Sequence, residues 1–423
     1  MNDPVEILAV IPTGLLLLVV ISQLAIFAAR RPVRFTKGYT PSVTVIIPAH
    51  NEGRHIRATL DAVLGGGYPG RLKVIAIDDG SSDETPEVLR SYSGDSRVKI
   101  MRTDHIGKSR AMNRALGIAT TEIVITIDGD TVMEKGSIEA LVAPFSDRMV
   151  AATTGVIKVG NTSHPLSWFQ RLEYLNFAFF KSVCERIHAV IAASGPLSAF
   201  RRKYLVKAGG FSTTTYLEDF DVAIKLIKAG YRTHFVQDAV CYTFVPERLI
   251  ALARQRFRWT RGGAQIIKQH FDMFLNRKYR GPGMYSMPLL SYWYIHSVMI
   301  GIALLLQIVM GYNAYFLSKG VVFSPDVALY FFNWFSVFGI IAVAYNTLTG
   351  AWTLTLLAAM NMVLLALTYG IFLLALRMFG ERFTWKDLIA FIFMFPYWLI
   401  GLFVQSLSNI EWSRKSGDNW WRK

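Results

Sequence analysis

The sequence predicts an α/β domain with a mostly parallel sheet, inserted between transmembrane α-helices. An uncharged apolar run, residues 7–29, is long enough to cross a bilayer, which takes ~20 residues. Short β-rich segments alternate with helical segments between residues 43 and 127. Further uncharged runs fill most of residues 281–410. These three observations together give the fold class.

The composition indicates a chain that is part membrane and part soluble. Its 423 residues suggest two or three units, and 52% are hydrophobic whereas only 18% are charged. The net charge of +15 fits nucleic acid, anionic lipid or a phosphorylated substrate as partner. Because the basic residues flank apolar runs and form no nucleic-acid-binding module, we exclude nucleic acid and favour the membrane surface. The two cysteines, Cys184 and Cys241, lack metal-site spacing and are expected to be reduced.

The first apolar run predicts an N-terminal transmembrane helix within residues 1–30. Acidic residues precede it, and basic residues follow it: Asp3 and Glu6 before, then Arg30, Arg31, Arg34 and Lys37. Basic residues tend to stay on the cytoplasmic side, so the N-terminus is expected outside and the next domain in the cytoplasm. The sequence therefore predicts an integral protein of the cell membrane.

Residues 38–245 form the predicted cytoplasmic α/β domain. Strands are expected at residues 43–47, 74–77, 98–101 and 123–127, and helices at 54–64, 84–92 and 110–117. In such a sheet, ligands gather at the carboxyl ends of the strands.

A later segment of this domain, residues 165–183, has an apolar stripe at helical spacing. The stripe consists of Trp168, Leu172, Leu175 and Phe179. It fits equally a helix at the membrane interface and a helix that faces the core.

The rest of the chain predicts a return to the membrane. Residues 246–283 form a basic amphipathic segment, and residues 284–410 hold about four transmembrane helices. The basic tail, residues 411–423, is expected in the cytoplasm. A basic loop with Arg377 and Arg382 would then lie outside, so one helix could be re-entrant.

Two acidic clusters follow predicted strands. In the stretch 78–83, Asp78 and Asp79 could accept hydrogen bonds from a nucleobase or ribose, although an ordinary Asp-Gly turn is the alternative. Asp128 and Asp130 flank one glycine, and in an extended chain they point to the same side. Two such carboxylates can hold a divalent ion that neutralises a diphosphate leaving group.

Two further clusters follow later in the chain. Glu218 and Asp219 open a predicted helix, where carboxylates are common as caps, but Asp219 could also be a general base. In the stretch 255–259, the arginines Arg256 and Arg258 could neutralise donor phosphate charge, and Trp259 could stack under a sugar ring. Binding of anionic lipid is the alternative for that basic stretch.

The four clusters, in this order, resemble the processive branch of the family 2 glycosyltransferases, which have a GT-A fold with a Rossmann-like sheet. Members include cellulose, chitin, hyaluronan and poly-N-acetylglucosamine synthases. The resemblance covers roughly residues 41–263, with further matches at 45–52, 107–113 and 194–202.

The resemblance implies a role for each matching residue. Donor-binding residues would be Pro48, Asn51, Glu52, Asp78, Asp79, Lys108, Asp128, Asp130, Gln255, Arg258 and Trp259. Among them, Asp78 and Asp79 would contact uridine, and Asp128 and Asp130 would bind Mg²⁺ or Mn²⁺. The base would be Asp219 beside Glu218, and the acceptor would contact Ser194, Gly195, Pro196 and Trp259.

The implied function is inverting polymerisation of a β-linked polysaccharide from a UDP-sugar, with translocation of the product across the bilayer. Implied partners are the UDP-sugar, the growing polysaccharide or a lipid acceptor, the bilayer, and accessory subunits or a second copy. Alternatives are a non-processive enzyme that makes a glycolipid, and a non-catalytic component that binds nucleotide or glycan. Leu217 stands where the family has Thr. The stretch 194–197 is typical of hyaluronan or chitin synthases, whereas 218–221 is typical of cellulose-like or poly-N-acetylglucosamine synthases, so the sugar stays open.

Overall fold

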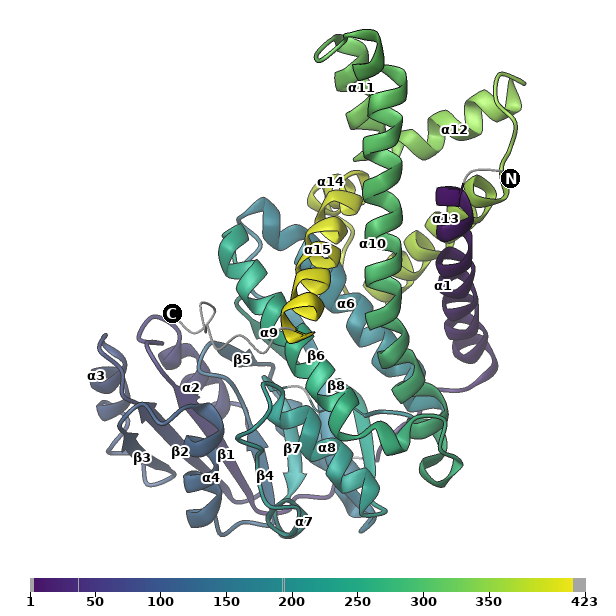
Figure 1. The fold of residues 1–423 in the computed structure, drawn as a ribbon. Helices are drawn as coiled ribbons and strands as arrows, with labels where there is room; N and C mark the ends of the chain where they lie inside the picture. Colours follow the sequence, from purple (N-terminus) through teal and green to yellow (C-terminus); the bar gives the residue numbers. More distant parts are fainter. Residues whose placement is uncertain (1–3, 37, 192, 194, 414–423) are drawn as a thin grey trace.

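The computed structural model describes residues 4–36, 38–191, 193 and 195–413, and it has two parts (Figure 1). An α/β domain built on one sheet lies at one end, and long helices extend away from it at the other. Asp3, Lys37, Ser194 and the tail 414–423, which carried sequence predictions, lie outside the described residues.

The sheet has eight strands in the described residues, in the order β3-β2-β1-β4-β7-β6-β8-β5. Their bounds are β1 (Val43–Ala49), β2 (Leu72–Asp79), β3 (Val98–Thr103), β4 (Ile123–Thr126), β5 (Thr131–Met133), β6 (Val150–Val159), β7 (Ser198–Arg201) and β8 (Arg232–Thr243). The four strands predicted from sequence, β1 to β4, pair in parallel. In the other half only β6 and β8 are parallel, while β7 runs antiparallel to β4 and β6, and β5 to β8. The sheet as a whole is therefore mixed.

Helices cover both faces of this sheet. They are α2 (Ile56–Leu64), α3 (Thr85–Arg90), α4 (Lys108–Ile118), α5 (Ser137–Val142), α7 (Arg202–Lys207) and α8 (Glu218–Lys228). Neighbouring residues of β1 pack against helices on opposite faces of the sheet, because side chains alternate along a strand. Val45 packs with Leu60 of α2 on one face, and Ile46 packs with Met112 of α4 on the other. The sheet is thus buried on both sides, as its continuous apolar strands require.

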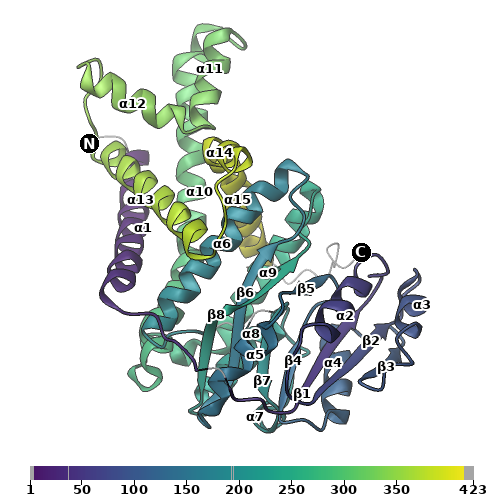
Figure 2. The same cartoon turned by 180° about the vertical axis from the view of Figure 1, so that it is seen from behind.

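The helix α6 (Pro165–Arg186) lies between the sheet and the membrane helices (Figure 2). Its stripe, Trp168, Leu172, Leu175 and Phe179, is at most 8% exposed. The stripe belongs to one apolar cluster with Phe372 of α13 (Leu356–Met378). Of the two alternatives from sequence, the core-facing one is therefore confirmed.

Three helices in the described residues are long and apolar enough to cross a membrane, or up to five if each bent pair counts as one span. The long ones are Ala9–Ala29 within α1 (Pro4–Ala29), Pro282–Lys319, which contains α10 (Met287–Tyr315), and α13. The bent pairs are α11 (Pro325–Trp334) with α12 (Phe338–Leu348), at 101°, and α14 (Trp385–Ile392) with α15 (Met394–Ser413), at 59°. The four apolar regions expected after the domain are present, and two of them are bent.

Ion pairs connect the α/β domain to the membrane helices. Arg171 of α6 pairs with Asp387 of α14 and, at 2.8 Å, with Glu381 in the loop before it. Lys158 of β6 also reaches Glu381, at 2.9 Å. The Asp387 side chain is only 1% exposed, and Arg171 is the cation that pairs with it.

We expect Asp387→Asn to lower the free energy of unfolding by about 3 kcal/mol, because it removes one of the two carboxylates that offset the charge of the buried Arg171. Thermal unfolding of the detergent-solubilised protein measures this. Glu87→Gln is the matched control, since Glu87 and Arg90 form a pair that is 65% and 67% exposed. Equal transition temperatures for the two variants would contradict the account.

Candidate functional site

The candidate site lies where β4 ends and α4 and α8 begin. Lys108, the first residue of α4, donates from Nζ to Asp128 Oδ1 at 2.6 Å. The same ammonium lies 3.5 Å from Glu218 Oε1 at the start of α8. Desolvation disfavours the charged lysine, but Asp128, Glu218 and Asp219 outweigh it and raise the pKa of Lys108 above its usual value. One cation therefore joins carboxylates from two separate elements.

Gly195 faces this charge cluster. A Cβ added there would lie 3.2 Å from Lys108 Nζ, 3.4 Å from Asp219 Oδ2 and 3.8 Å from Asp128 Oδ2. Three predicted site residues are therefore gathered around one glycine, whose missing side chain leaves room beside them. Pro196 is half-buried next to it.

Asp219 has the surroundings of a base that titrates above the usual aspartate range. Its Oδ1 accepts the N–H of Phe220 at 2.8 Å. Burial raises the pKa of Asp219, and the charges of Glu218 and Asp128 raise it further, whereas Lys108 lowers it. A carboxylate with a raised pKa holds a proton more strongly, so Asp219 is a better proton acceptor than an ordinary aspartate.

Three carboxyl groups crowd the turn between β4 and β5. Burial and the charge of Asp128 raise the pKa of Asp130 to about 6. Burial and the charges of Asp130 and Asp128 raise the pKa of Glu52 to about 7. Glu52 packs against Gly129, since a Cβ added there would lie 3.1 Å from Glu52 Cγ. This excess of negative charge fits a divalent cation, whose preferred ligands are such oxygens.

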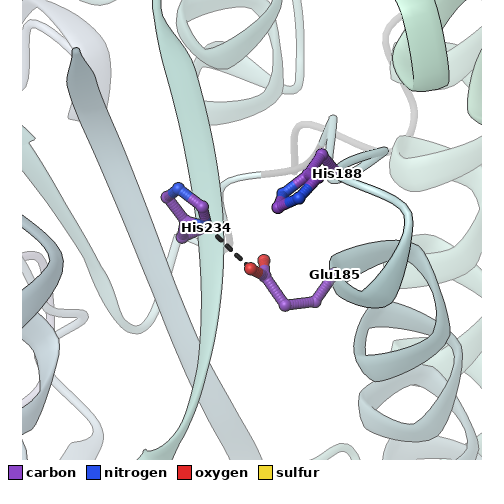
Figure 3. Close-up of side chains that lie close together, drawn as sticks. All are labelled: Glu185, His188 and His234. Atoms are coloured by element: carbon purple, nitrogen blue, oxygen red, sulfur yellow. Dashed lines mark hydrogen bonds and ion pairs between the residues drawn. The ribbon is translucent and has the colours of Figure 1, made fainter. Parts of the chain in front are cut away.

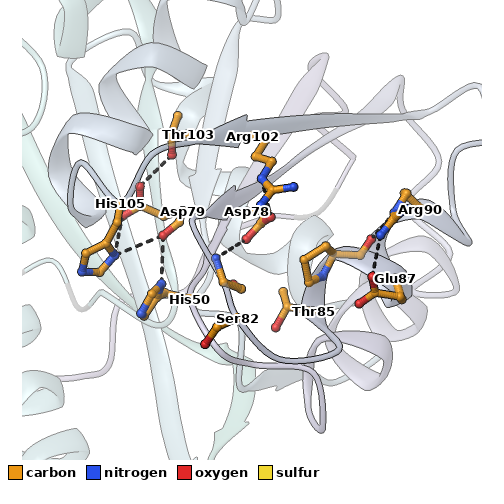
Figure 4. Close-up of polar contacts among 12 residues, drawn as sticks. His50, Asp78, Asp79, Ser82, Thr85, Glu87, Arg90, Arg102, Thr103 and His105 are labelled. Atoms are coloured by element: carbon orange, nitrogen blue, oxygen red, sulfur yellow. Dashed lines mark hydrogen bonds and ion pairs between the residues drawn. The ribbon is translucent and has the colours of Figure 1, made fainter.

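Asp79, expected to contact a nucleobase, also organises the protein itself (Figure 4). Its Oδ1 accepts bonds from Thr103 Oγ1 at 2.6 Å and Ile106 N–H at 2.8 Å, and its Oδ2 accepts Gly107 N–H at 2.8 Å. Burial opposes the charged form, but these bonds outweigh it and lower the pKa of Asp79. Asp79 thereby fixes the turn that precedes Lys108. Asp79 Oδ2 can accept a second donor, and contact with a base through it stays a prediction.

The other predicted donor-binding residues line the same edge. Asp78 Oδ1 accepts Ser81 N–H at 2.8 Å, which closes the turn after β2. Asn51, at φ 59°, donates its N–H to Ser81 Oγ at 3.0 Å and accepts Ser82 N–H at 2.9 Å. Pro48 lies in β1 opposite Ile77. These residues shape the wall of the site.

The stretch 255–259 lies on α9 (Leu249–Gln269), where the sequence singled out Arg258. The structure exposes Arg258 and buries Arg256, which pairs with Glu173 of α6 and donates to the Tyr397 hydroxyl of α15 at 2.9 Å. The Arg256 guanidinium lies 4.3 Å from the ring centre of Trp259. The role of Arg256 was missed because both arginines lie within one helical turn. The sequence feature that could have indicated its burial is the four-residue spacing from Leu252, since the two residues lie on the same buried face of α9.

Trp259 and Gln255 lie on the same helix, α9. Trp259 lies 6.3 Å, centre to centre, from the ring of Tyr174, which the sequence did not single out. Gln255 Oε1 is buried and has no hydrogen-bond partner within the described residues. An unsatisfied buried acceptor is costly, so it is available to a donor group of a ligand.

Comparisons with known proteins extend this picture. The sequence profile of a family described as "Glycosyltransferase like family 2" matches residues 41–262. An N-acetylglucosaminyltransferase of Rhizobium sp. (strain N33) is 31% identical over 237 residues, which cover 52% of this chain and 52% of that protein. A poly-beta-1,6-N-acetyl-D-glucosamine synthase of Staphylococcus aureus (strain COL) is 29% identical over 239 residues, 56% of this chain and 58% of that protein. The chain thus spans about half the length of the curated relatives it matches.

A solved structure shares the fold over nearly the whole chain. It is a mannosyltransferase from Pyrobaculum calidifontis in complex with GDP-Man and Mn²⁺, with a TM-score of 0.59 and 22% sequence identity. The likeness covers 97% of this chain and 100% of that chain. At this identity the likeness establishes the fold alone.

The bonds of Asp79 generate a prediction for the turn before Lys108. In Asp79→Asn, one acceptor oxygen becomes a donor, so one of the two amides, Ile106 or Gly107, loses its acceptor and should exchange with deuterium at least about tenfold faster, since a lost bond contributes about 1–3 kcal/mol. Hydrogen–deuterium exchange with mass spectrometry measures this. Asp104→Asn, at an exposed aspartate of the same turn, is the control. Unchanged exchange in Asp79→Asn would show that these bonds do not hold the turn.

Proposed function

Since this chain belongs to the family described as glycosyltransferase like family 2, we propose that it transfers a hexose from a UDP-sugar to the end of a β-linked polysaccharide. The observation that carries this proposal is the gathering of Lys108, Asp128, Glu218 and Asp219 beside Gly195. It combines a cation for phosphate with a carboxylate suited to remove a proton. The resemblance predicted from the sequence motifs is confirmed at the level of the family.

In the proposed reaction, Asp219 accepts the proton of the acceptor hydroxyl as that oxygen attacks the anomeric carbon of the donor. A bond forms from the acceptor oxygen to this carbon, and the bond from the carbon to the diphosphate breaks. The diphosphate leaves with the bonding electrons. One direct displacement inverts the configuration, so an α-linked donor gives a β-linkage.

The leaving diphosphate needs positive charge on the donor side. Lys108 supplies one positive charge next to Asp128, and we propose that Arg258, which is exposed on α9, supplies another. A magnesium or manganese ion held by Asp130 and Asp128 would neutralise the diphosphate further. Glu218 touches Lys108 and thereby positions it, so Glu218 acts through another residue.

The acceptor end would lie on the side of α9. Trp259 offers a ring for a sugar to stack on, beside Tyr174. Helix α9 packs against α15 and α10, and Tyr294 of α10 donates to the Thr260 carbonyl at 2.6 Å. A polymer that leaves this site would therefore meet the membrane helices directly, which supports translocation by the same chain.

The names of two relatives support the choice of sugar. Both are named for the transfer of N-acetylglucosamine or for its polymer. This agrees with the stretch 218–221, which is typical of cellulose-like and poly-N-acetylglucosamine synthases. We therefore propose UDP-N-acetylglucosamine as the donor.

We also propose that the α/β domain lies on the cytoplasmic side of the membrane, because basic residues follow α1.

The direct test is product formation by the purified chain in lipid, with UDP-glucose, UDP-N-acetylglucosamine and UDP-glucuronate, singly and in pairs, and Mg²⁺ or Mn²⁺. We expect UDP release and a ladder of high-mass products from UDP-N-acetylglucosamine alone. UDP release with only a lipid-sized product would favour the glycolipid alternative. No turnover with any donor would contradict the proposal.

For the base, we expect Asp219→Asn to lower kcat by at least about a hundredfold while the affinity for UDP-sugar stays within about twofold. The amide cannot accept the proton, but Lys108 keeps its contacts to Asp128 and Glu218. Isothermal titration with donor and a UDP-release assay measure the two quantities. Asp238→Asn, at an exposed position of β8, is the control. Turnover close to wild type in Asp219→Asn would exclude Asp219 as the base.

The raised pKa of Asp219 predicts the acidic limb of the pH–rate profile. The base works only when it is deprotonated, so kcat should fall as the pH drops through a value above the usual aspartate range. Glu218→Gln removes a negative charge that raises this pKa, so the limb should move down by about one pH unit. Glu87→Gln should leave it in place. A limb that moves up in Glu218→Gln would contradict the assignment.

A further inference from the structure

A second group of metal-ligating side chains lies far from the proposed catalytic site. Glu185, His188 and His234 each offer one ligand atom, and these atoms lie within 4.8 Å of one another. Figure 3 shows the three side chains pointing toward a common space. His234 stands near the start of β8, whereas Thr243 at its end contacts Asp130. Their partners on the parallel strand β6, Thr153 and Val159, are six residues apart, which corresponds to about 20 Å.

Two of the three side chains are buried and held in place. Glu185, in the last turn of α6, is 3% exposed, and His234 is 6% exposed. Glu185 Oε2 accepts the Phe235 N–H at 2.7 Å, and Glu185 Oε1 lies 2.6 Å from His234 Nδ1. The backbone bond fixes the carboxylate, as an orienting contact does for a metal ligand.

The third side chain is exposed but stands on a fixed turn. His188 has φ 53°, a left-handed conformation that costs roughly 1 kcal/mol for a residue other than glycine. The turn is held on both sides, since Ala189 N–H donates to the Cys184 carbonyl at 2.8 Å and Ser286 donates to the Ala189 carbonyl. The His188 and His234 rings are 6.1 Å apart and perpendicular, at 89°. The His188 imidazole thus flanks the buried pair.

We propose that Glu185, His188 and His234 bind a zinc ion, with the fourth position open to solvent on the exposed side of His188. Two imidazole nitrogens and one carboxylate oxygen suit zinc, which accepts both and is commonly tetrahedral. Magnesium and calcium prefer oxygen ligands throughout, so they fit this group poorly. On binding, Glu185 Oε1 turns from His234 to the ion and keeps its Phe235 bond through Oε2. The Glu-x-x-His spacing of 185 and 188 is the sequence signal.

The site lies where several parts of the chain meet. Phe35, in the connection that leaves α1, packs edge-on against His234 with 5.1 Å between ring centres. Arg186 donates to the Arg30 carbonyl in the same connection. His188 also begins the segment that leads to Gly195. A bound zinc ion therefore ties the end of α6 and the start of β8 together, beside the connection from α1 and ahead of the proposed acceptor loop. This structural role goes beyond the proposed reaction.

The test uses the full chain, purified in detergent with an affinity tag that contains no histidine and stripped with a chelator. His188→Asn removes the ligand, and asparagine tolerates a left-handed backbone. His164→Asn is the matched control, because His164 is an exposed histidine at the other end of α6 that accepts the Leu166 N–H, which asparagine can also do. Zinc is added in a titration, and cobalt(II) is added separately as a spectroscopic probe.

We expect wild type and His164→Asn to bind one zinc per chain, to gain visible cobalt absorption and to show a higher unfolding temperature with zinc. His188→Asn should bind zinc at least about tenfold more weakly and lose both signals. Asp130→Asn should keep the zinc affinity and both signals, because Asp130 contacts Thr243 at the end of β8 that is far from His234. Absence of stoichiometric binding in wild type, or equal affinity in His188→Asn, would overturn the proposal. Loss of zinc binding in Asp130→Asn would also overturn the proposal, since the ion would then be bound near Asp130 and not by Glu185, His188 and His234.

Discussion

The arrangement of the site depends on the ion pairs that the Lys108 ammonium makes with carboxylates. Carboxylates from the end of β4 and from the start of α8 meet at this one charge, at 2.6 Å for Asp128 and 3.5 Å for Glu218. Two like charges ~4 Å apart repel by roughly 4 kcal/mol at the effective dielectric of a protein surface, so the cluster requires a cation. Asp79 in turn fixes Gly107, the residue before Lys108. The end of β2, the start of α4, the end of β4 and the start of α8 are thus connected through one chain of polar contacts.

The second constraint is the attachment of this domain to the membrane helices. Helix α6 carries Arg171 to Asp387 of α14 and Glu173 to Arg256 of α9. Its apolar stripe belongs to one apolar cluster with Val156 of β6 and Phe372 of α13. The same two helices, α6 and α9, bring Tyr174 and Trp259 to the proposed acceptor side. The contacts that attach the domain to the membrane helices therefore also position the residues proposed to meet the polymer.

The predictability of the fold follows the strength of the local pattern. Strands β1, β2 and β4 were predicted because each contains an apolar run that ends at a turn, and β3 was predicted from its shorter β-rich stretch, residues 98–101. Strands β5 to β8 were not predicted. β5 and β7 have only three and four residues and include polar ones. The longer strands β6 and β8 contain polar residues such as Thr153 and Gln237, which interrupt their apolar runs. The stripe of α6 predicted a helix. The sequence does not show whether an apolar side chain such as Leu172 contacts lipid or another side chain, here Phe372. In the site, motif residues such as Lys108 and Asp128 were found, whereas the contact of Glu185 with His234 is set by tertiary structure alone.

The central claim is that the charge of Lys108 assembles the site, and one variant tests it directly. Lys108→Met keeps much of the side-chain volume but leaves Asp128, Glu218 and Asp219 without their shared cation. The measurement is the rate of UDP release by the purified chain in lipid, with Lys99→Met, at an exposed lysine of β3, as the control. The account predicts a loss of at least about a hundredfold in Lys108→Met and little change in Lys99→Met. UDP release at the wild-type rate in Lys108→Met would contradict it.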